Sequence, residues 1–286
     1  MMDIFIFNVG LGQCIFFYPR TNHDYATMVD CGNTPEFEPV DFLIAKNFLS
    51  YNSDLKKHIL SNLTMTNYDQ DHFSGLPYLR SKVKITTSNF MKNLTGQEIR
   101  SIKDVVTNAA EEVINIIETY TSDAVNYTPP FTKHCYTLTK ADFPGEAIDT
   151  NKLSQLVFIT YKTTRICIPG DLTTPAWEKH LLNENVRILL GGTDIFVASH
   201  HGREDGFNEN VFKYCKPEVI ILSDKDIIHS TQEGQTQTYA GQVKGSGIVF
   251  NGNTTSLRKV LTTRSDGHLW IRIEEDGTRT YKSFTV

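Results

Sequence analysis

The sequence predicts a single α/β domain of stacked layers over residues 1–286, and three observations favour this fold class. Short apolar runs of strand length occur in two blocks, one over residues 3–66 and one from residue 151 onward. Helical patterns lie between and after these runs, as is typical of layered α/β domains. No internal repeat at a solenoid or propeller period is present, so we expect one continuous domain.

The first block contains four β-rich runs with the composition and length of strands, at residues 3–9, 13–19, 26–32 and 58–66. Residues 39–51 carry apolar side chains at helical spacing, which predicts a helix between the third and fourth strands. Residues 96–121 predict one long amphipathic helix, because apolar residues recur at three- and four-residue steps. Thr95 and Glu98 match a capping box at its start. We assign residues 89–150 to a helical insertion within the domain.

The second block contains four further apolar runs, at residues 155–161, 164–171, 194–202 and 219–224. The segment WEKHLL, residues 177–182, predicts a helix between the second and third of these runs. Residues 268–284 predict a terminal β-hairpin, because two alternating β-rich runs flank the turn pair Asp276 and Gly277.

Charge and cysteine content narrow the function classes. The net charge of −5, the pI of about 6.0 and the absence of a Lys/Arg run weigh against a protein that coats nucleic acid. They do not weigh against a nuclease, because bound divalent cations supply positive charge locally. Five cysteines without a CxxC pair favour a reducing compartment. The start resembles no signal peptide and no apolar run reaches about 18 residues, so we expect a cytoplasmic protein without a membrane span.

Polar side chains follow four of the apolar runs directly or closely. They are Asp69, Asp71 and His72 after the fourth strand, Asp171 after residues 164–168, His200 and His201 after residues 194–198, and His229 after residues 219–224. Loops after strands are where α/β folds carry their chemistry. Imidazole and carboxylate ligands suit zinc, manganese or iron. Taken one by one, the same residues also fit solvated turns or surface positions.

The order of these segments resembles a known family. FNVGLGQCIFF, MVDCG, TNYDQDHFSG, NKLSQLVFITYKTTRICIPGDL and VASHHG are similar to the motifs of metallo-β-lactamase-fold hydrolases, specifically the hydrolase domain of the DNA-uptake protein ComEC and its free-standing relatives. The resemblance runs from about residue 4 to the C-terminus, excluding the insertion. It implies a four-layer αββα metallo-β-lactamase-like sandwich with a helical insertion.

The resemblance also implies roles for individual residues. The implied metal ligands are Asp69, Asp71, His72, Asp171, His200 and His201. The implied catalytic residues are Asp71, Asp171, His201 and His229. Asp71 and His72 would ligate a second metal and Asp69 a first one, while Asp171 would bridge both. One of His200 and His201 would complete a site, and the other would orient it or touch substrate. His229 would contact substrate or act as a terminal ligand.

Three positions depart from the family motifs. Asn67 replaces the first histidine of the metal motif, which leaves a vacant ligand position. Asn8 and Gln13 replace acids of the opening motif, so two carboxylates that would support the ligands are absent. An amide oxygen is a poor zinc ligand but suits harder cations such as Mn²⁺ or Mg²⁺. We therefore expect one or two Zn or Mn ions, with the second site intact and the first weakened.

The function implied is that of a metal-dependent hydrolase, a phosphodiesterase or nuclease that uses a metal-bound hydroxide on DNA, RNA or a nucleotide. A first alternative is a catalytically weakened pseudoenzyme of the same fold that acts as a sensor or partner-binding module. A second is a hydrolase of esters or phosphorylated wall components. The insertion at residues 89–150 is a candidate surface for a protein partner, although its helix also suits packing on its own domain.

Overall fold

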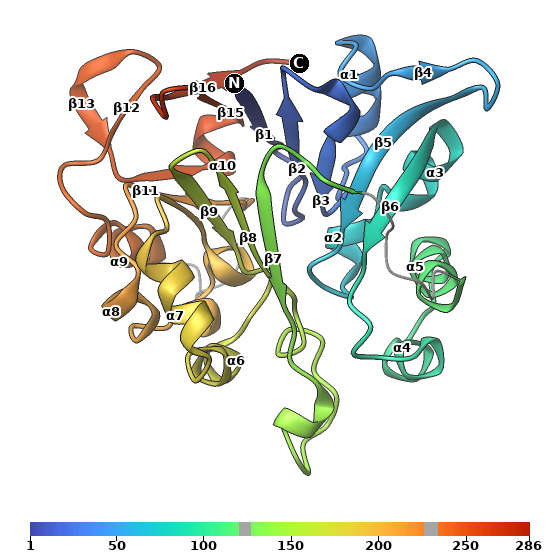
Figure 1. Cartoon of the computed structure of the whole chain (residues 1–286). Helices are drawn as coiled ribbons and strands as arrows, with labels where there is room; N and C mark the ends of the chain where they lie inside the picture. The colour runs from blue at the N-terminus through green and yellow to red at the C-terminus, as the bar shows by residue number, and fades with distance from the viewer. Residues whose placement is uncertain (120–126, 226–233) are drawn as a thin grey trace.

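Two β-sheets face each other in the centre of the molecule, and helices cover the outer side of each sheet (Figure 1). The computed structural model describes residues 1–119, 127–225 and 234–286. From one side to the other the layers are helix, sheet, sheet and helix. This order confirms the predicted αββα sandwich, in which each sheet buries one face against its partner and the other against helices.

The first sheet joins strands from both ends of the chain. Its strands are β1 (Met2–Ile6), β2 (Ile15–Pro19), β3 (Thr27–Val29), β4 (Tyr51–Asn52), β5 (Lys57–Thr64), β6 (Val83–Asn89), β12 (Ile248–Phe250), β13 (Asn253–Arg258), β15 (His268–Ile273) and β16 (Arg279–Phe284). Their order is β13–β12–β16–β15–β1–β2–β3–β5–β4, with β6 beside β5. Strands β3, β5 and β6 run parallel, and β15 and β16 form the predicted terminal hairpin.

The second sheet is formed mainly by the second apolar block. Its strands are β7 (Thr132–Tyr136), β8 (Leu156–Tyr161), β9 (Thr164–Ile168), β10 (Ile195–Val197), β11 (Val219–Leu222) and β14 (Val260–Thr262), in the order β14–β11–β10–β9–β8–β7. Strands β9, β10, β11 and β14 run parallel to one another. The loops that follow these parallel strands therefore leave the sheet at the same edge.

Helices lie on the outer faces of both sheets. Those nearest the first sheet are α1 (Pro39–Ala45), α2 (Gln70–Phe73), α3 (Leu76–Lys82), α4 (Gly96–Ile102) and α5 (Asn108–Thr119). Those that follow strands of the second sheet are α6 (Thr174–His180), α7 (Glu184–Gly191), α8 (Val211–Tyr214), α9 (Gln235–Ala240) and α10 (Thr263–Asp266). Single 3-10 turns are η1 (His23–Tyr25), η2 (Lys140–Asp142) and η4 (Glu204–Gly206), and the short segment η3 (Ser199–Gly202) contains non-helical residues. Figure 1 places α3 and α5 on one outer side and α6, α7 and α8 on the other.

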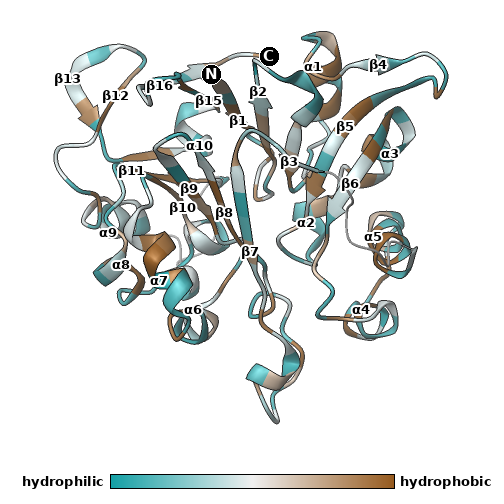
Figure 2. Cartoon of the chain, viewed as in Figure 1, coloured by the Kyte–Doolittle hydropathy of each residue, from teal (hydrophilic) through white to brown (hydrophobic). Residues whose placement is uncertain are grey.

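Alternation along the strands divides the core into layers. Ile4 and Ile6 of β1 belong to the cluster between the two sheets, together with apolar side chains of β8, β9, β10 and β11. Phe5 and Phe7 point to the opposite face, where both rings pack against Phe42 of α1. Successive side chains of a strand point to opposite faces, so one apolar run serves both layers. Figure 2 shows hydrophobic residues concentrated on strands of both sheets.

The expectation of one helix over residues 96–121 is wrong, because the chain leaves the helix after Ile102 and α5 begins at Asn108. Lys103 already has an extended backbone. The three β-branched residues Val105, Val106 and Thr107 favour this break, since such residues are poor helix formers. The Thr107 hydroxyl also accepts the Ala110 amide at 3.2 Å and thereby caps α5. The capping box of Thr95 and Glu98 at the start of α4 is confirmed.

The segment 89–150 also contributes β7, an edge strand of the second sheet that the expectation of a helical insertion did not include. Lys133 of β7 reaches across to the first sheet. Its ammonium donates to Asn62 Oδ1 at 2.7 Å, Thr64 Oγ1 at 2.9 Å and Asn89 Oδ1 at 2.6 Å. Burial among these neutral acceptors lowers the pKa of Lys133 to about 8. The lysine thus links β7 to the ends of β5 and β6.

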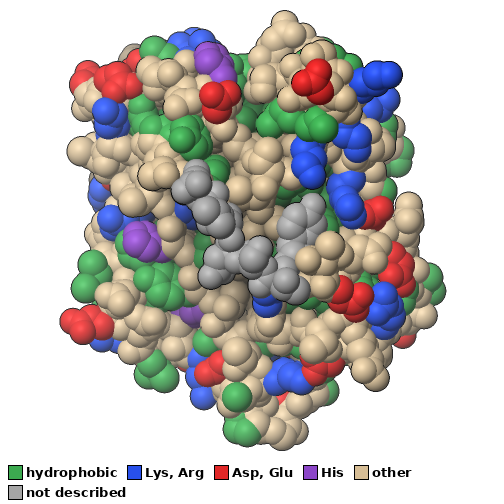
Figure 3. Space-filling model, turned by 45° about the vertical axis from the view of Figure 1, so that its right-hand side comes forward, with side chains coloured by type: hydrophobic (Ala, Val, Ile, Leu, Met, Phe, Trp, Pro, Cys, Tyr) green, Lys and Arg blue, Asp and Glu red, His purple; other side chains and the backbone are tan. Residues whose placement is uncertain are grey.

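The surface carries charges of both signs. Figure 3 shows basic side chains gathered at the upper right of the drawn face, and acidic side chains beside basic ones lower down. Among the described residues, no helix combines the length and the hydrophobicity that a membrane crossing requires.

Candidate metal centre

Four side chains from both sheets meet at one point. They are Asp71, His72, Asp171 and His201, and one ligand atom of each lies within 4.8 Å of those of the other three. Asp71 and His72 lie in α2, shortly after β5, while Asp171 follows β9 and His201 follows β10. His72, Asp171 and His201 are buried, and Asp71 is half-buried. The loops after β5, β9 and β10 therefore converge.

The rotation of both imidazole rings is fixed by a bond to Nδ1. His201 Nδ1 lies 2.9 Å from the carbonyl oxygen of Ser223, and His72 Nδ1 lies 2.8 Å from Asp30 Oδ2. A carbonyl oxygen only accepts hydrogen bonds, so Nδ1 of His201 carries the proton and Nε2 is free for a ligand. Asp30 Oδ2 accepts the bond from His72 and so favours the same tautomer of that ring.

The free Nε2 atoms point at carboxylates. His72 Nε2 lies 3.1 Å from Asp171 Oδ1, and His201 Nε2 lies 3.1 Å from Asp71 Oδ2 and 3.4 Å from Asp171 Oδ1. When each ring carries a proton only on Nδ1, Nε2 of both histidines and Oδ1 of Asp171 are buried polar atoms without a hydrogen-bond partner in the described part of the chain. Leaving such atoms unpaired is costly. Two imidazoles and two carboxylates around one point fit a divalent cation such as Zn²⁺ or Mn²⁺.

The four groups shift one another's pKa values. Burial alone lowers the pKa of His201, but Asp171 and Asp71 outweigh burial and raise it to about 10. Burial likewise opposes the charged form of His72, yet Asp171 and Asp30 raise its pKa well above the usual value. Burial raises the pKa of Asp171, but His72 and His201 hold it well below its ordinary range. Without a cation, protons on the histidines balance the carboxylates, and a bound cation replaces them.

Asp30 supports the centre and was not among the predicted site residues. Its Oδ2 receives the Gln13 side-chain amide at 2.7 Å and the Thr66 hydroxyl, in addition to His72. Its Oδ1 receives the Thr66 amide at 2.7 Å. The backbone of Asp30 adopts the left-handed region at φ 57°, which Asp tolerates better than most residues. Gln13, expected only as a lost carboxylate, therefore holds the carboxylate that orients His72. The sequence offered one signal that could have identified Asp30, namely an acidic residue at the end of the apolar run MVD.

Glycines let the backbone close around Asp71. A Cβ atom on Gly12 or on Gly32 would lie 2.4 Å from the carbonyl oxygen of Asp71. The loop after β1 and the segment after β3 therefore both press on the residue that carries the first carboxylate. Only glycine permits this approach without moving Asp71.

His201 is delivered by an unusual turn. His200, His201 and Gly202 have φ values of 48°, 55° and 78°, all in the left-handed region. Each non-glycine residue in that region costs about 1 kcal/mol. A turn of this kind persists because its surroundings hold it, as is common at functional sites.

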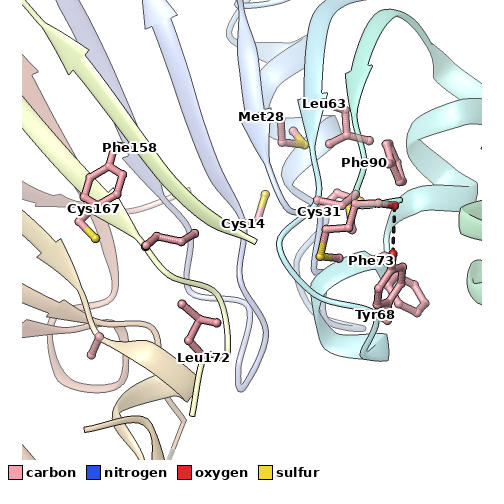
Figure 4. Close-up of a cluster of buried hydrophobic side chains, with 14 of the residues drawn as sticks. Cys14, Met28, Cys31, Leu63, Tyr68, Phe73, Phe90, Phe158, Cys167 and Leu172 are labelled. Atoms are coloured by element: carbon pink, nitrogen blue, oxygen red, sulfur yellow. Dashed lines mark hydrogen bonds between the residues drawn. The ribbon is translucent and has the colours of Figure 1, made fainter. Parts of the chain in front are cut away.

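Buried aromatic residues anchor the loop that carries Asp71 and His72. Tyr68 precedes α2 and Phe73 is the last residue of α2, and both are buried. The Tyr68 hydroxyl donates to the carbonyl oxygen of Met91 at 3.0 Å. Figure 4 shows Tyr68 and Phe73 beside each other near Cys31 and Phe90. The loop is thus pinned to the core on both sides of its ligands.

The structure does not bring the other predicted residues into this cluster. Asp69 accepts hydrogen bonds from Lys103 at 2.7 Å and from the Thr150 hydroxyl at 3.1 Å. The Asn67 amide donates to Asn151 at 2.8 Å. His200 lies outside the cluster, and its Nδ1 is 2.8 Å from Asp205 Oδ1. His229 lies outside the described residues, which exclude 226–233.

Comparison with known proteins gives information on the fold. No family model matches the sequence, and no curated protein is significantly similar to it. Among solved structures, a variant of the β-hydroxylase CmlA is 12% identical with a TM-score of 0.51, over 94% of this chain and 54% of that chain. A diphosphatase from the PhnP family is 9% identical with a TM-score of 0.47, over 96% and 98%. The metallo-β-lactamase fold protein YhfI from Bacillus subtilis is 9% identical with a TM-score of 0.44, over 86% and 95%.

At 12% identity the likeness to the CmlA variant concerns the fold alone. The αββα layers, with a cluster of imidazoles and carboxylates where the strand-end loops of both sheets meet, define the class. The chain has the metallo-β-lactamase fold and carries a candidate centre for a divalent metal.

Proposed function

We propose that the protein is a metal-dependent hydrolase that cleaves phosphodiesters. The observation that carries the proposal is the meeting of three buried atoms without hydrogen-bond partners among the described residues, namely Nε2 of His72, Nε2 of His201 and Oδ1 of Asp171. One divalent cation satisfies all three. The resemblance of five sequence segments to the ComEC hydrolase domain directs the proposal toward phosphodiesters in DNA, RNA or nucleotides.

Each residue of the centre has a distinct task in this proposal. Asp71, His72, Asp171 and His201 would hold the cation, while Asp30 and the Ser223 carbonyl keep the two rings in place. A cation bound there would supply a water of lowered pKa and positive charge for the phosphate oxygens.

His200, the histidine of the pair that lies outside the cluster, is assigned a supporting task in the binding of substrate. His200 Nδ1 donates to Asp205, and Arg203 Nη1 lies 3.2 Å from His200 Nε2. The Arg203 guanidinium is always charged and suits a phosphate oxygen. We therefore assign the contact with the phosphodiester to Arg203, and we assign to His200 the task of holding the Arg203 guanidinium in place.

The pseudoenzyme remains the second candidate, and one observation favours it. Asn67 and Asn151 bind each other through their amides at 2.8 Å, and neither is a strong ligand for zinc. A protein that only senses or binds a partner would tolerate such a pair. It would not require the unpartnered atoms of His72, His201 and Asp171.

The test combines metal content with turnover. We expect purified protein supplemented with Zn²⁺ or Mn²⁺ to retain metal and to hydrolyse bis(p-nitrophenyl) phosphate or an oligonucleotide. His201→Ala removes one ligand and should abolish both properties, while His134→Ala, at an exposed position of β7, should preserve both. Retained metal without turnover on any phosphodiester would favour the pseudoenzyme. Absence of bound metal after supplementation would overturn the hydrolase and also leave the pseudoenzyme as the better account.

A further inference from the structure

A second polar cluster lies beside the candidate metal centre and involves the same loop. Lys103 Nζ lies 2.7 Å from Asp69 Oδ1, and the Thr150 hydroxyl lies 3.1 Å from both oxygens of Asp69. The Asn67 amide binds Asn151 at 2.8 Å, while its oxygen receives the Asp69 amide at 3.0 Å. We call these five residues the Lys103 cluster.

Lys103 reaches this place because of the break between α4 and α5. Its backbone is extended where the helix stops, and its side chain is only 19% exposed. Thr107, on the same connection, donates to the side-chain oxygen of Gln70 at 2.6 Å. The segment between the two helices is therefore fastened to residues 69–70, directly before the ligands Asp71 and His72.

The Lys103 cluster does not fit a second metal ion. Both oxygens of Asp69 already have donors, and the amide of Asn67 is engaged with Asn151. A divalent cation at this place would have to displace the ammonium of Lys103. None of the atoms of these five side chains is a buried atom without a partner, in contrast to those of His72, His201 and Asp171. These contacts therefore disagree with the expectation that Asp69 ligates a first metal, because hydrogen-bond donors already occupy both of its oxygens.

We propose that Lys103 is a built-in cation that stands where a second metal would otherwise bind, so that the centre holds a single divalent ion. This inference rests on the proposed function, since it concerns the same centre. The Lys103 ammonium pairs with Asp69 Oδ1 at 2.7 Å and so occupies one of the oxygens that a second metal would need. A fixed ammonium also gives an anionic substrate a second positive charge beside the metal.

The charge that each substitution removes or keeps predicts whether divalent cations bind more tightly, more weakly or equally well. Lys103→Met removes a positive charge near the ion, so divalent cations should bind more tightly, by roughly threefold to thirtyfold from Coulomb's law at a protein surface. Asp69→Asn leaves the ammonium without its counter-charge, so binding should weaken by a similar factor. Lys103→Arg keeps the charge and should bind like the wild type. Lys92→Met removes an exposed lysine from the same insertion and is the matched control.

The experiment is a calorimetric titration of metal-free protein with Zn²⁺ and with Mn²⁺, with thermal unfolding as a check of folding. One ion per chain in the wild type, tighter binding in Lys103→Met, weaker binding in Asp69→Asn and no change in Lys92→Met support the inference. Should Lys103→Met fail to fold, Asp69→Asn and Lys103→Arg decide alone.

Two results would overturn the inference. One is a wild type that binds two ions and an Asp69→Asn variant that binds one, because Asp69 would then be a ligand. The other is an unchanged affinity in both Lys103→Met and Asp69→Asn. A wild type that binds no ion at all contradicts the proposed function instead, and so the two failures are distinguishable.

Discussion

Asp30 shows how a residue without contact to the proposed ion controls a ligand. Its two carboxylate oxygens accept hydrogen bonds from the Thr66 amide, the Gln13 side chain and the His72 ring. Because Asp30 Oδ2 accepts the hydrogen bond from the ring, the proton of His72 lies on Nδ1. The ring then presents Nε2 toward Asp171, 3.1 Å away. The metal affinity of His72 therefore depends on Asp30.

We predict that Asp30→Asn weakens metal binding by roughly 10- to 100-fold, the usual effect of losing a partner that orients a ligand. Asparagine has the same shape and tolerates a left-handed backbone, so the fold should survive. Titration with Zn²⁺ measures the effect, and Asp54→Asn at an exposed position serves as the control. Equal affinities in the two variants would show that Asp30 does not orient His72.

Among the elements, the loops after the strands, rather than the strands themselves, place the ligands of the candidate metal centre. Gly32 follows β3, and a Cβ there would lie 2.4 Å from the Asp71 carbonyl oxygen and 3.0 Å from that of Gln13. Both obstacles are backbone atoms, which cannot rotate away as a side chain would. Any larger residue at this position must shift the loop that carries Asp71.

We predict that Gly32→Ala destabilises the protein by about 1–3 kcal/mol, as overpacking does, and lowers metal affinity. Gly191→Ala is the matched control, because the nearest atom to its added Cβ lies 3.9 Å away and alanine is favoured in helix α7. Urea unfolding with and without Zn²⁺ measures both quantities. If Gly32→Ala behaved like Gly191→Ala, the loop would have more freedom than the distances indicate.

Elements with strong local patterns could be predicted from the sequence, and those defined by distant partners could not. The apolar runs before Asp71, Asp171 and His201 indicated both strands and ligands. β7 was missed because TKHCY is polar, and its pairing with β8 depends on residues 20 to 28 positions away. The break after Ile102 was missed because apolar spacing continues through it. The role of Asp30 depends on His72, 42 positions away.

At the scale of the whole molecule, the four shifted pKa values give the metal-free protein a defined pH optimum. The pKa of His201 is raised from 6.5 to about 10, so its contribution is complete below pH 6.5 and is lost as pH rises toward 10. The pKa values of Asp71 and Asp171 lie below their ordinary 3.8, so their contribution is present above that pH and is lost in stronger acid.

We therefore predict that metal-free protein is most stable between about pH 4 and 6.5 and weakens steadily toward pH 10. Bound Zn²⁺ should reverse the alkaline trend, because the ion replaces the protons of His72 and His201. Thermal unfolding at pH 5, 6.5, 8 and 9.5, with chelator or with Zn²⁺, measures this. A metal-free protein that gains stability from pH 6.5 to 9.5 would contradict the assigned shifts.

The ligands come in equal numbers from the two halves of the sandwich, Asp71 and His72 from the first sheet and Asp171 and His201 from the second. An ion held by all four therefore links the two sheets at one edge, and a chelator can remove this link. Its withdrawal should loosen that edge locally and leave the apolar interior between the sheets closed. Hydrogen–deuterium exchange should then speed up near Thr66 and Gly170 in chelator, while amides of β1, paired on both sides, remain slow.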